Sequence, residues 1–252
     1  MRLDGYSVLV TGAGGGVGQG IARALAIDGA HVFVATRSEK GHAVAADLTE
    51  SGYRASWVRC DVTVSQSVVG AVETTLHETG RLDALVHNAT SNASSQPHRL
   101  EDVNDALWRD HIGVSVTGAY HCASAAFESL RARAGTFLVM TSPTGIEGSA
   151  TLPLYATMKG ALRGFAKSLA REWGAHGITV NVISPLAYSP AMTAAIEADP
   201  AMEGRLARRI PLGRIGDPQM DIGSAVVFLV GPRARYITGQ TIGVDGGHFT
   251  SL

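Results

Sequence analysis

The sequence predicts an α/β fold: a Rossmann-like, doubly wound parallel sheet of seven strands with helices on both faces. Short apolar runs rich in β-branched residues alternate with segments of helical periodicity along nearly the whole chain. A glycine-rich turn joins the first apolar run to the first helical segment. With 252 residues, 45% of them hydrophobic and 17% charged, the chain can bury a full core.

Seven apolar runs predict the strands. In chain order they are 6–11, 31–36, 55–60, 82–87, 136–141, 178–183 and 240–244. Apolar residues recur at helical spacing in the segments between them, for example in 17–29, 68–80 and 162–174. Parallel strands need crossover connections of this length, which are right-handed and place helices over both faces of the sheet.

We expect residues 1–252 to form a single domain, because the chain shows no internal repeat, low-complexity tract or linker. The most irregular stretches are 88–104, 142–153 and 184–218. Each follows the carboxyl end of a predicted strand, where open α/β sheets bind their ligands. One crevice at that edge is therefore the expected binding site.

The charge balance excludes several classes of partner. The chain has 21 Lys and Arg against 22 Asp and Glu, a formal net charge of −1, and no long basic run. We therefore expect no nucleic-acid partner and no anionic membrane surface as a partner. No apolar run reaches the roughly 18 residues of a membrane span, and the residues after Met1 do not resemble a signal peptide.

Cysteine and histidine usage limits the chemistry further. Cys60 and Cys122 lie in apolar segments without a pairing pattern, which is typical of reduced thiols in a cytoplasmic protein. The nine histidines form no metal-binding motif, so we predict no catalytic metal. His87 ends a predicted strand at the expected crevice, where it can either contact a ligand or pack in the core.

The glycine-rich turn spans residues 11–18, with the sequence TGAGGGVG. Glycines let the backbone turn tightly and approach a pyrophosphate, which then rests on the free N–H groups at the start of the next helix. The turn therefore predicts a dinucleotide site. Its candidate contacts are Gly12, Gly14, Gly16, Val17 and Gly18.

The end of the second strand indicates which dinucleotide binds. An NAD site carries an acid near this position for the ribose 2′-hydroxyl. Here the residues are Thr36, Arg37 and Ser38. Arg37 can pair with a 2′-phosphate, and Thr36 or Ser38 can donate to it. The sequence therefore favours NADP(H), with NAD(H) as the alternative.

Three polar side chains in residues 142–159 form a candidate catalytic set. Tyr155 and Lys159 are four residues apart, which places both on one face of a helix. A nearby ammonium favours the phenolate, so we expect a lowered tyrosine pKa and a general acid/base near neutral pH. Ser142 precedes them across a loop broken by prolines and glycines, and its hydroxyl can hold a substrate oxygen beside the phenol.

The glycine turn and the set Ser142, Tyr155 and Lys159 together closely resemble the short-chain dehydrogenase/reductase family. The resemblance covers essentially the whole chain. Three more segments fit it: Asp61-Val62-Thr63, which resembles the adenine-side contact, Asn88-Ala89, which resembles the turn after the fourth strand, and 238–247, which resembles the last-strand signature.

The resemblance implies hydride transfer between a nicotinamide and a carbonyl or alcohol carbon of a small molecule. By this resemblance Tyr155 is the acid/base, Ser142 the donor to the substrate oxygen, and Lys159 both the activator of the tyrosine and a partner of the nicotinamide ribose. Pro185 and Leu186, after the sixth strand, take the place of a Pro-Gly pair beside the cofactor.

Five residues that depart from the family pattern surround the nicotinamide end. Ser115 stands where the family has an asparagine that holds a water in a proton relay to the lysine, so we place Ser115 in the catalytic set. His87 and Thr90 replace two residues of the turn after the fourth strand. Leu186 replaces a glycine, and Pro190 replaces a threonine that meets the carboxamide.

Residues 186–216 mix apolar side chains with arginines, as a lid over an apolar substrate pocket does. By resemblance to the family we also expect a homodimer or homotetramer.

These features together predict an NADP(H)-dependent oxidoreductase acting on a ketone or secondary alcohol. The departures leave two alternatives open. One is an NADP(H)-binding protein of the same fold with little or no redox turnover. The other is a non-redox reaction, or the reduction of a double bond, on the same scaffold.

Overall fold

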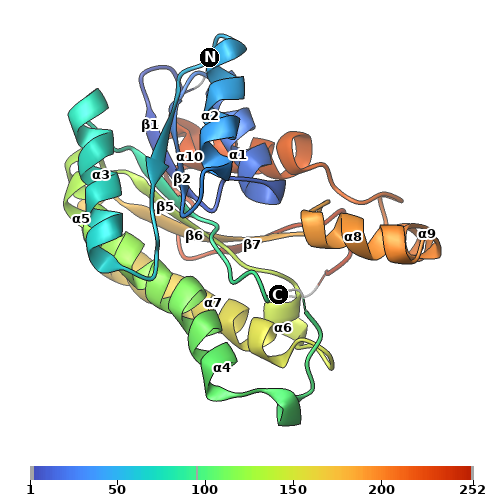
Figure 1. Cartoon of the computed structure of the whole chain (residues 1–252). Coiled ribbons are helices and arrows are strands. Elements are labelled where there is room, and N and C mark those ends of the chain that lie inside the picture. Colours follow the sequence, from blue (N-terminus) through green and yellow to red (C-terminus); the bar gives the residue numbers. More distant parts are fainter. Residues whose placement is uncertain (1–2, 95, 251–252) are drawn as a thin grey trace.

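The computed structural model describes residues 3–94 and 96–250. Its centre is a parallel sheet of seven strands in the order β3-β2-β1-β4-β5-β6-β7, which confirms the predicted fold class (Figure 1). The strands are β1 Ser7–Thr11, β2 His31–Thr36, β3 Ala55–Arg59, β4 Ala84–His87, β5 Thr136–Met140, β6 Thr179–Pro185 and β7 Thr241–Val244.

Helices fill every connection between successive strands. The α-helices are α1 Gly16–Ile27, α2 Lys40–Glu50, α3 Ser65–Thr79, α4 Asp105–His111, α5 Gly118–Arg133, α6 Thr144–Glu147, α7 Pro153–Trp173, α8 Pro190–Ala198, α9 Ala201–Arg209 and α10 Ser224–Val230. Short 3₁₀ turns occur at η1 Leu100–Asp102, η3 Gly174–His176 and η5 Pro232–Ala234, and π-helical turns at η2 Ile112–Thr117 and η4 Pro218–Gly223.

Two apolar clusters hold the helices against the two faces of the sheet. Val8 and Val10 of β1 pack with α1, α2 and α10, whereas Leu9 points to the opposite face, where α3, α5 and α7 lie (Figure 1). Alternate residues of a strand face opposite sides, so a strand covered on both sides is apolar throughout. This explains why the strands appear in the sequence as unbroken apolar runs.

The strand order reverses between β1 and β4, whose last residues, Thr11 and His87, are paired neighbours in the sheet. The chain leaves the sheet in opposite directions on the two sides of this point, which opens a crevice above the carboxyl ends of the strands. The predicted glycine turn and the segment after β4 both begin there.

The predicted lid contains α8 and α9, which project away from the sheet (Figure 1). None of the residues of these two helices is buried. A hydrogen bond from the Tyr188 hydroxyl to Glu203 joins the start of this segment to α9.

The helix over residues 105–133 is interrupted by a π-helical turn, which the periodicity does not predict. α4, η2 and α5 follow one another without an intervening residue, and Ser115 lies inside the π-helical turn. Single π-helical turns within α-helices occur frequently at functional sites. Within residues 3–94 and 96–250, no helix combines the length and the apolar character needed to cross a membrane.

Candidate active site

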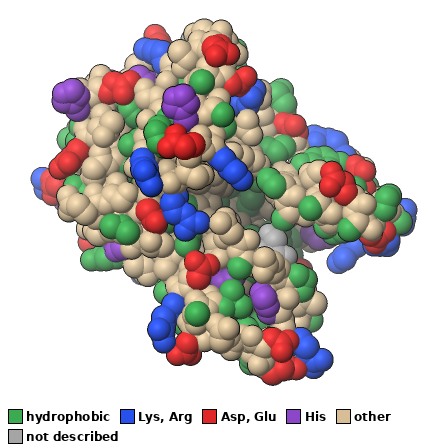
Figure 2. All heavy atoms as spheres, in the orientation of Figure 1, with side chains coloured by type: hydrophobic (Ala, Val, Ile, Leu, Met, Phe, Trp, Pro, Cys, Tyr) green, Lys and Arg blue, Asp and Glu red, His purple; other side chains and the backbone are tan. Residues whose placement is uncertain are grey.

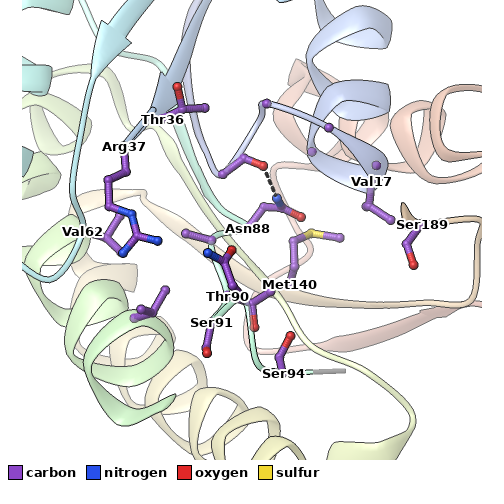
Figure 3. A pocket seen from close by; sticks show the side chains of 18 of the residues that line it. Val17, Thr36, Arg37, Val62, Asn88, Thr90, Ser91, Ser94, Met140 and Ser189 are labelled. Carbon is purple, nitrogen blue, oxygen red and sulfur yellow. Dashed lines mark hydrogen bonds between the residues drawn. The ribbon is translucent and has the colours of Figure 1, made fainter. Parts of the chain in front are cut away.

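A cavity of about 940 Å³ crosses the carboxyl ends of the central strands (Figure 3). Its lining comes from the glycine turn, the ends of β2 and β3, the segment after β4, α7 and the start of α8. Figure 2 shows the hollow in the surface between the body of the protein and the lobe of α8 and α9. All the predicted cofactor contacts except Leu186 line this cavity.

The glycine turn brings the backbone against two other segments. Gly12 has φ +67°, and a Cβ there would lie 2.8 Å from the Ala89 Cα. Gly16 has φ +54°, and a Cβ there would lie 2.7 Å from the Pro190 Cδ. No side chain caps α1, which begins at Gly16, so its first N–H groups are available to a pyrophosphate. The cradle therefore fits a dinucleotide.

Asn88 and Thr11 hold this turn in place. The Asn88 side-chain Nδ2 donates to the Gly12 carbonyl at 3.0 Å (Figure 3), and the Asn88 backbone N–H donates to the Thr11 hydroxyl at 3.1 Å. The Thr11 hydroxyl also accepts from the Ala89 N–H at 3.3 Å. Asn88 thus positions the cofactor cradle through its amide nitrogen, in addition to lining the cavity.

At the adenine end, the Thr36 hydroxyl cannot donate to a 2′-phosphate, contrary to the prediction. The Thr36 hydroxyl donates to the Ser38 carbonyl at 2.7 Å and accepts from the Trp57 indole N–H at 2.8 Å. A hydroxyl has only one proton, so none remains for a 2′-phosphate. Arg37 and Ser38 line the cavity, and so does Lys40, which our sequence reasoning missed. Lys40 could have been recognised in the sequence as a second basic residue, three positions after Arg37 and at the start of a helix.

Asp61 and Val62 lie at the same end of the cavity. One carboxylate oxygen of Asp61 accepts from the backbone N–H and the hydroxyl of Thr63, at 3.0 and 2.7 Å. The other oxygen has no hydrogen bond to the part of the chain that the structure describes, residues 3–94 and 96–250. Val62 and Val114 provide apolar surface beside it, as an adenine ring requires.

Tyr155 and Lys159 lie one turn apart near the start of α7, as the spacing predicts. The Lys159 Nζ is 5.4 Å from the centroid of the Tyr155 ring. Lys159 is only 3% exposed, and its Nζ donates to the Met140 carbonyl at the end of β5, at 2.8 Å. The Thr141 hydroxyl fixes the same turn by donating to the Lys159 carbonyl at 2.9 Å.

The expected lowering of the tyrosine pKa is not what this geometry produces. Burial raises the pKa of Tyr155, and a hydrogen bond from Ser142 opposes the rise only in part. Burial also lowers the pKa of Lys159 to about 8. Desolvation disfavours the charged form of each group. The phenol is therefore protonated at neutral pH and ready to act as a general acid.

Ser115 and His87 lie beneath the cavity and are not part of its lining. Both are about 2% exposed or less, and the His87 Nε2 lies 3.0 Å from the Ser115 carbonyl oxygen. Burial, followed by the nearby Lys159 charge, lowers the pKa of His87 to about 3. His87 therefore packs in the core, the second of the two readings offered by the sequence. The relay role of Ser115 stays a prediction.

After β6, the residues that line the cavity differ from the predicted cofactor contacts: Leu186 lies outside the lining, and Ser189 belongs to it. The Leu186 N–H donates to the Val244 carbonyl, and its own carbonyl accepts from the Gly216 N–H, so Leu186 is held away from the cavity. Pro185 lines the cavity as predicted. Ser189, which our sequence reasoning missed, also lines it and caps α8 by accepting from the Met192 N–H at 3.2 Å. Its hydroxyl proton remains available beside Pro190.

Comparison with known proteins agrees with this geometry. The family described as enoyl-(acyl carrier protein) reductase matches residues 12–248. The short-chain reductase protein NovJ of Streptomyces niveus is 36% identical over 246 residues, covering 95% of this chain and 92% of that protein. The 3-oxoacyl-[acyl-carrier-protein] reductase FabG of Vibrio harveyi is 36% identical over 251 residues, covering 99% of each chain.

Solved structures match over the same length. The gluconate 5-dehydrogenase of Burkholderia cenocepacia J2315, in complex with NADP and tartrate, superposes with a TM-score of 0.90 at 29% identity, covering 100% of this chain and 98% of that chain. The 3-ketoacyl-(acyl-carrier-protein) reductase of Brucella melitensis, complexed with NADH, gives a TM-score of 0.88 at 30% identity, covering 98% and 99%.

Four findings agree with one another: the glycine cradle, the set of Ser142, Tyr155 and Lys159, the strand order and the full-length matches. The chain belongs to the short-chain dehydrogenase/reductase family and is an NAD(P)-dependent oxidoreductase.

Proposed function

We propose that the protein is an NADP(H)-dependent oxidoreductase that interconverts a ketone and a secondary alcohol. One observation carries the proposal: Tyr155, whose ring centroid lies 5.4 Å from the Lys159 Nζ, lines the same cavity as the glycine cradle. The cavity therefore brings a proton donor to the place where the nicotinamide end of a dinucleotide must lie.

When bound, the nicotinamide supplies or accepts the hydride, and the residues of the chain handle the proton. Ser142 orients the substrate oxygen beside the phenol. Tyr155 gives its proton to that oxygen as negative charge develops on it during reduction. Lys159 then faces a phenolate, which its ammonium stabilises across the 5.4 Å between Nζ and the ring centroid. In the oxidation direction the same groups work in reverse.

The preference for NADP(H) rests on the basic residues at the end of β2. Arg37 and Lys40 both line the adenine end of the cavity. Glu39 is the one acidic residue in positions 36–40, and it lies outside the cavity lining. A 2′-phosphate can pair with both cations. The gluconate 5-dehydrogenase named above was solved with NADP and the 3-ketoacyl reductase with NADH, so membership of the family does not decide between the two nucleotides.

A second candidate is nucleotide binding with little turnover, and one observation favours it. The Ser115 carbonyl, at the position of the family's relay asparagine, already accepts from His87. A proton relay through this turn therefore has fewer hydrogen-bonding positions left for a water molecule. NADPH binding without reduction of any ketone would support this candidate.

The exposed apolar residues support a homodimer or homotetramer as a further part of the proposal. Tyr120 on α5 is 56% exposed and Phe228 on α10 is 44% exposed, and β7 forms an edge of the sheet. Light scattering coupled to size-exclusion chromatography tests the assembly state. A monomer at micromolar concentration would contradict it.

Replacing Tyr155 by Phe tests the proposed reaction. The substitution removes the proton donor but keeps the ring, so turnover of a ketone panel should fall at least roughly 100-fold. The affinity for NADPH, measured by fluorescence titration, should stay nearly unchanged. Tyr236→Phe, at a fully exposed position, is the matched control. Full activity in the Tyr155 variant would exclude the proposed role.

A further inference from the structure

The cavity has a polar end that the sequence did not lead us to expect. The segment after β4 contributes the hydroxyls of Thr90, Ser91 and Ser94, which gather below Met140 in Figure 3. Asp110 of α4 adds a carboxylate to the same lining. The sequence predicted an apolar pocket beneath the lid, whereas of the lid segment only Ser189, Pro190 and Ala191 reach the cavity.

Ser91 orients the carboxylate. Its hydroxyl donates to one carboxylate oxygen of Asp110 and accepts from the Ala93 N–H at 3.0 Å, which fixes the hydroxyl in one direction. Ser91 is 2% exposed and forms part of the cavity wall, whereas Asp110, which also lines the cavity, is exposed. The second oxygen of Asp110 accepts no hydrogen bond from the residues described, 3–94 and 96–250, and is free to accept from a ligand.

Ser94 adds a donor beside this carboxylate. Its backbone N–H donates to the Ser91 carbonyl at 3.0 Å, which closes the turn and brings the two side chains to one wall. Ser94 is only 6% exposed, yet its hydroxyl makes no hydrogen bond within the described part of the chain. The Ser94 hydroxyl oxygen is open to the cavity, where a ligand can supply its hydrogen-bond partner.

This polar wall lies on the side of the catalytic residues. α4, which carries Asp110, packs against α7, which carries Tyr155. An apolar acyl chain placed here would strip water from a carboxylate without replacing its hydrogen bonds, which is unfavourable. An anionic substrate group would be repelled by the same charge. Neutral hydroxyl groups fit both side chains, since they donate to Asp110 and accept from Ser94.

We propose that Asp110, held by Ser91, and Ser94 select a neutral polyhydroxylated ketone or alcohol as the substrate. This inference rests on the proposed function, because it concerns the substrate of the same cavity. Hydroxyl groups next to the reacting carbon donate to the free oxygen of Asp110, and one accepts from Ser94.

The test compares erythrulose with butan-2-one, which have the same carbon chain and the same carbonyl position but differ in hydroxyl groups. The wild-type protein should reduce erythrulose with the higher kcat/KM. In Asp110→Ala the ratio of the two kcat/KM values should fall roughly tenfold or more, chiefly through KM. Asp105→Ala, on the same helix but outside the cavity, should keep the wild-type ratio. An unchanged ratio in Asp110→Ala, or a wild-type preference for butan-2-one, would overturn the proposal.

A binding measurement separates this inference from the proposed function. Saturation-transfer NMR of erythritol on the NADPH complex needs no turnover. Erythritol should bind the wild-type complex more tightly than the Asp110→Ala or Ser94→Ala complexes. Such binding without any reduction of erythrulose would reject the proposed reaction and retain the recognition site. Equal binding by all three proteins would reject the recognition site, whatever the activity.

Discussion

The imidazole of His87 donates from Nε2 to the backbone carbonyl of Ser115 at 3.0 Å, linking the end of β4 to the π-helical turn η2. Because Nε2 faces an acceptor, Nδ1 is the unprotonated nitrogen, and it lies 3.3 Å from the Thr11 hydroxyl. Positions 87 and 115 both depart from the family pattern. Their contact makes the two departures one structural unit beneath the cofactor cradle.

This contact predicts acid lability centred on His87. The pKa is about 3 in the folded protein and near 6.5 in the unfolded chain. Between these values only the unfolded chain takes up the proton, so stability falls as pH decreases from 6.5 towards 3. The loss is on the order of a few kcal/mol. His87→Gln keeps a donor for Ser115 but cannot be protonated, so its stability should fall less over this range.

Urea unfolding at pH 7 and pH 4.5 measures the effect of His87→Gln. His77→Gln, at an exposed position on α3, is the control and should follow the wild-type curve. A parallel loss of stability in the wild-type and His87→Gln proteins would show that His87 is not the group responsible.

Lys159 predicts a dependence of the same sign at alkaline pH. Its pKa is about 8 in the folded protein, against an ordinary value of 10.5. Below pH 8 the buried ammonium destabilises the fold, and the penalty disappears as pH rises from 8 to 10.5. Lys159→Met should therefore abolish turnover yet raise the free energy of unfolding at pH 7, by on the order of 3 kcal/mol.

The Lys159 variant is best followed by its unfolding free energy at several pH values. The advantage of Lys159→Met over the wild-type protein should shrink steadily between pH 8 and pH 10.5. A variant that is less stable than the wild-type protein at pH 7 would mean that the Met140 hydrogen bond outweighs the desolvation of the ammonium.

Nucleotide choice is predicted to depend on Arg37 and Lys40. The double change Arg37→Ala and Lys40→Ala removes both cations from the adenine end. The Kd for NADPH should rise roughly 10- to 100-fold, while the Kd for NADH changes little. Fluorescence titration with both nucleotides measures this. Arg54→Ala, whose side chain pairs with Asp4 outside the cavity, is the control. Equal loss of both affinities would contradict a 2′-phosphate site.

The glycine cradle predicts a contrast between two neighbouring substitutions. Gly12→Ala forces a Cβ to within 2.8 Å of the Ala89 backbone at a positive φ, so it should lower stability by about 2 kcal/mol or more. Gly15→Ala meets no atom within 4 Å and has no such φ, so it should leave the stability of the nucleotide-free protein nearly unchanged. Equal effects in urea unfolding would mean that the close approach is not the cause.

The fold could be predicted from the sequence because its strands are covered on both faces. A strand such as β5, buried at every residue, appears as an unbroken apolar run, and all seven runs proved to be strands. The π-helical turn at Ser115 gives no such signal, since it is a single short turn inside a longer helical segment. The direction in which α8 and α9 project from the sheet could not be predicted either, because the amino-acid composition of these helices does not determine it.

The candidate site was predictable where it depends on short-range geometry. The four-residue spacing of Tyr155 and Lys159 was enough to place both on one turn of helix. The pKa of Tyr155 was not predictable, because it depends on burial by residues distant in sequence. Asp110 was missed for the same reason, since only the folded chain brings α4 beside Ser91.

A crystal structure with NADPH bound tests the central claim most directly, through the distance from the Tyr155 hydroxyl oxygen to the nicotinamide C4. A substrate oxygen must reach the phenol while its carbon reaches C4, so we predict a distance of roughly 5 Å or less. A nicotinamide ring outside the cavity, or a phenol more than twice that distance from C4, would contradict the proposed chemistry.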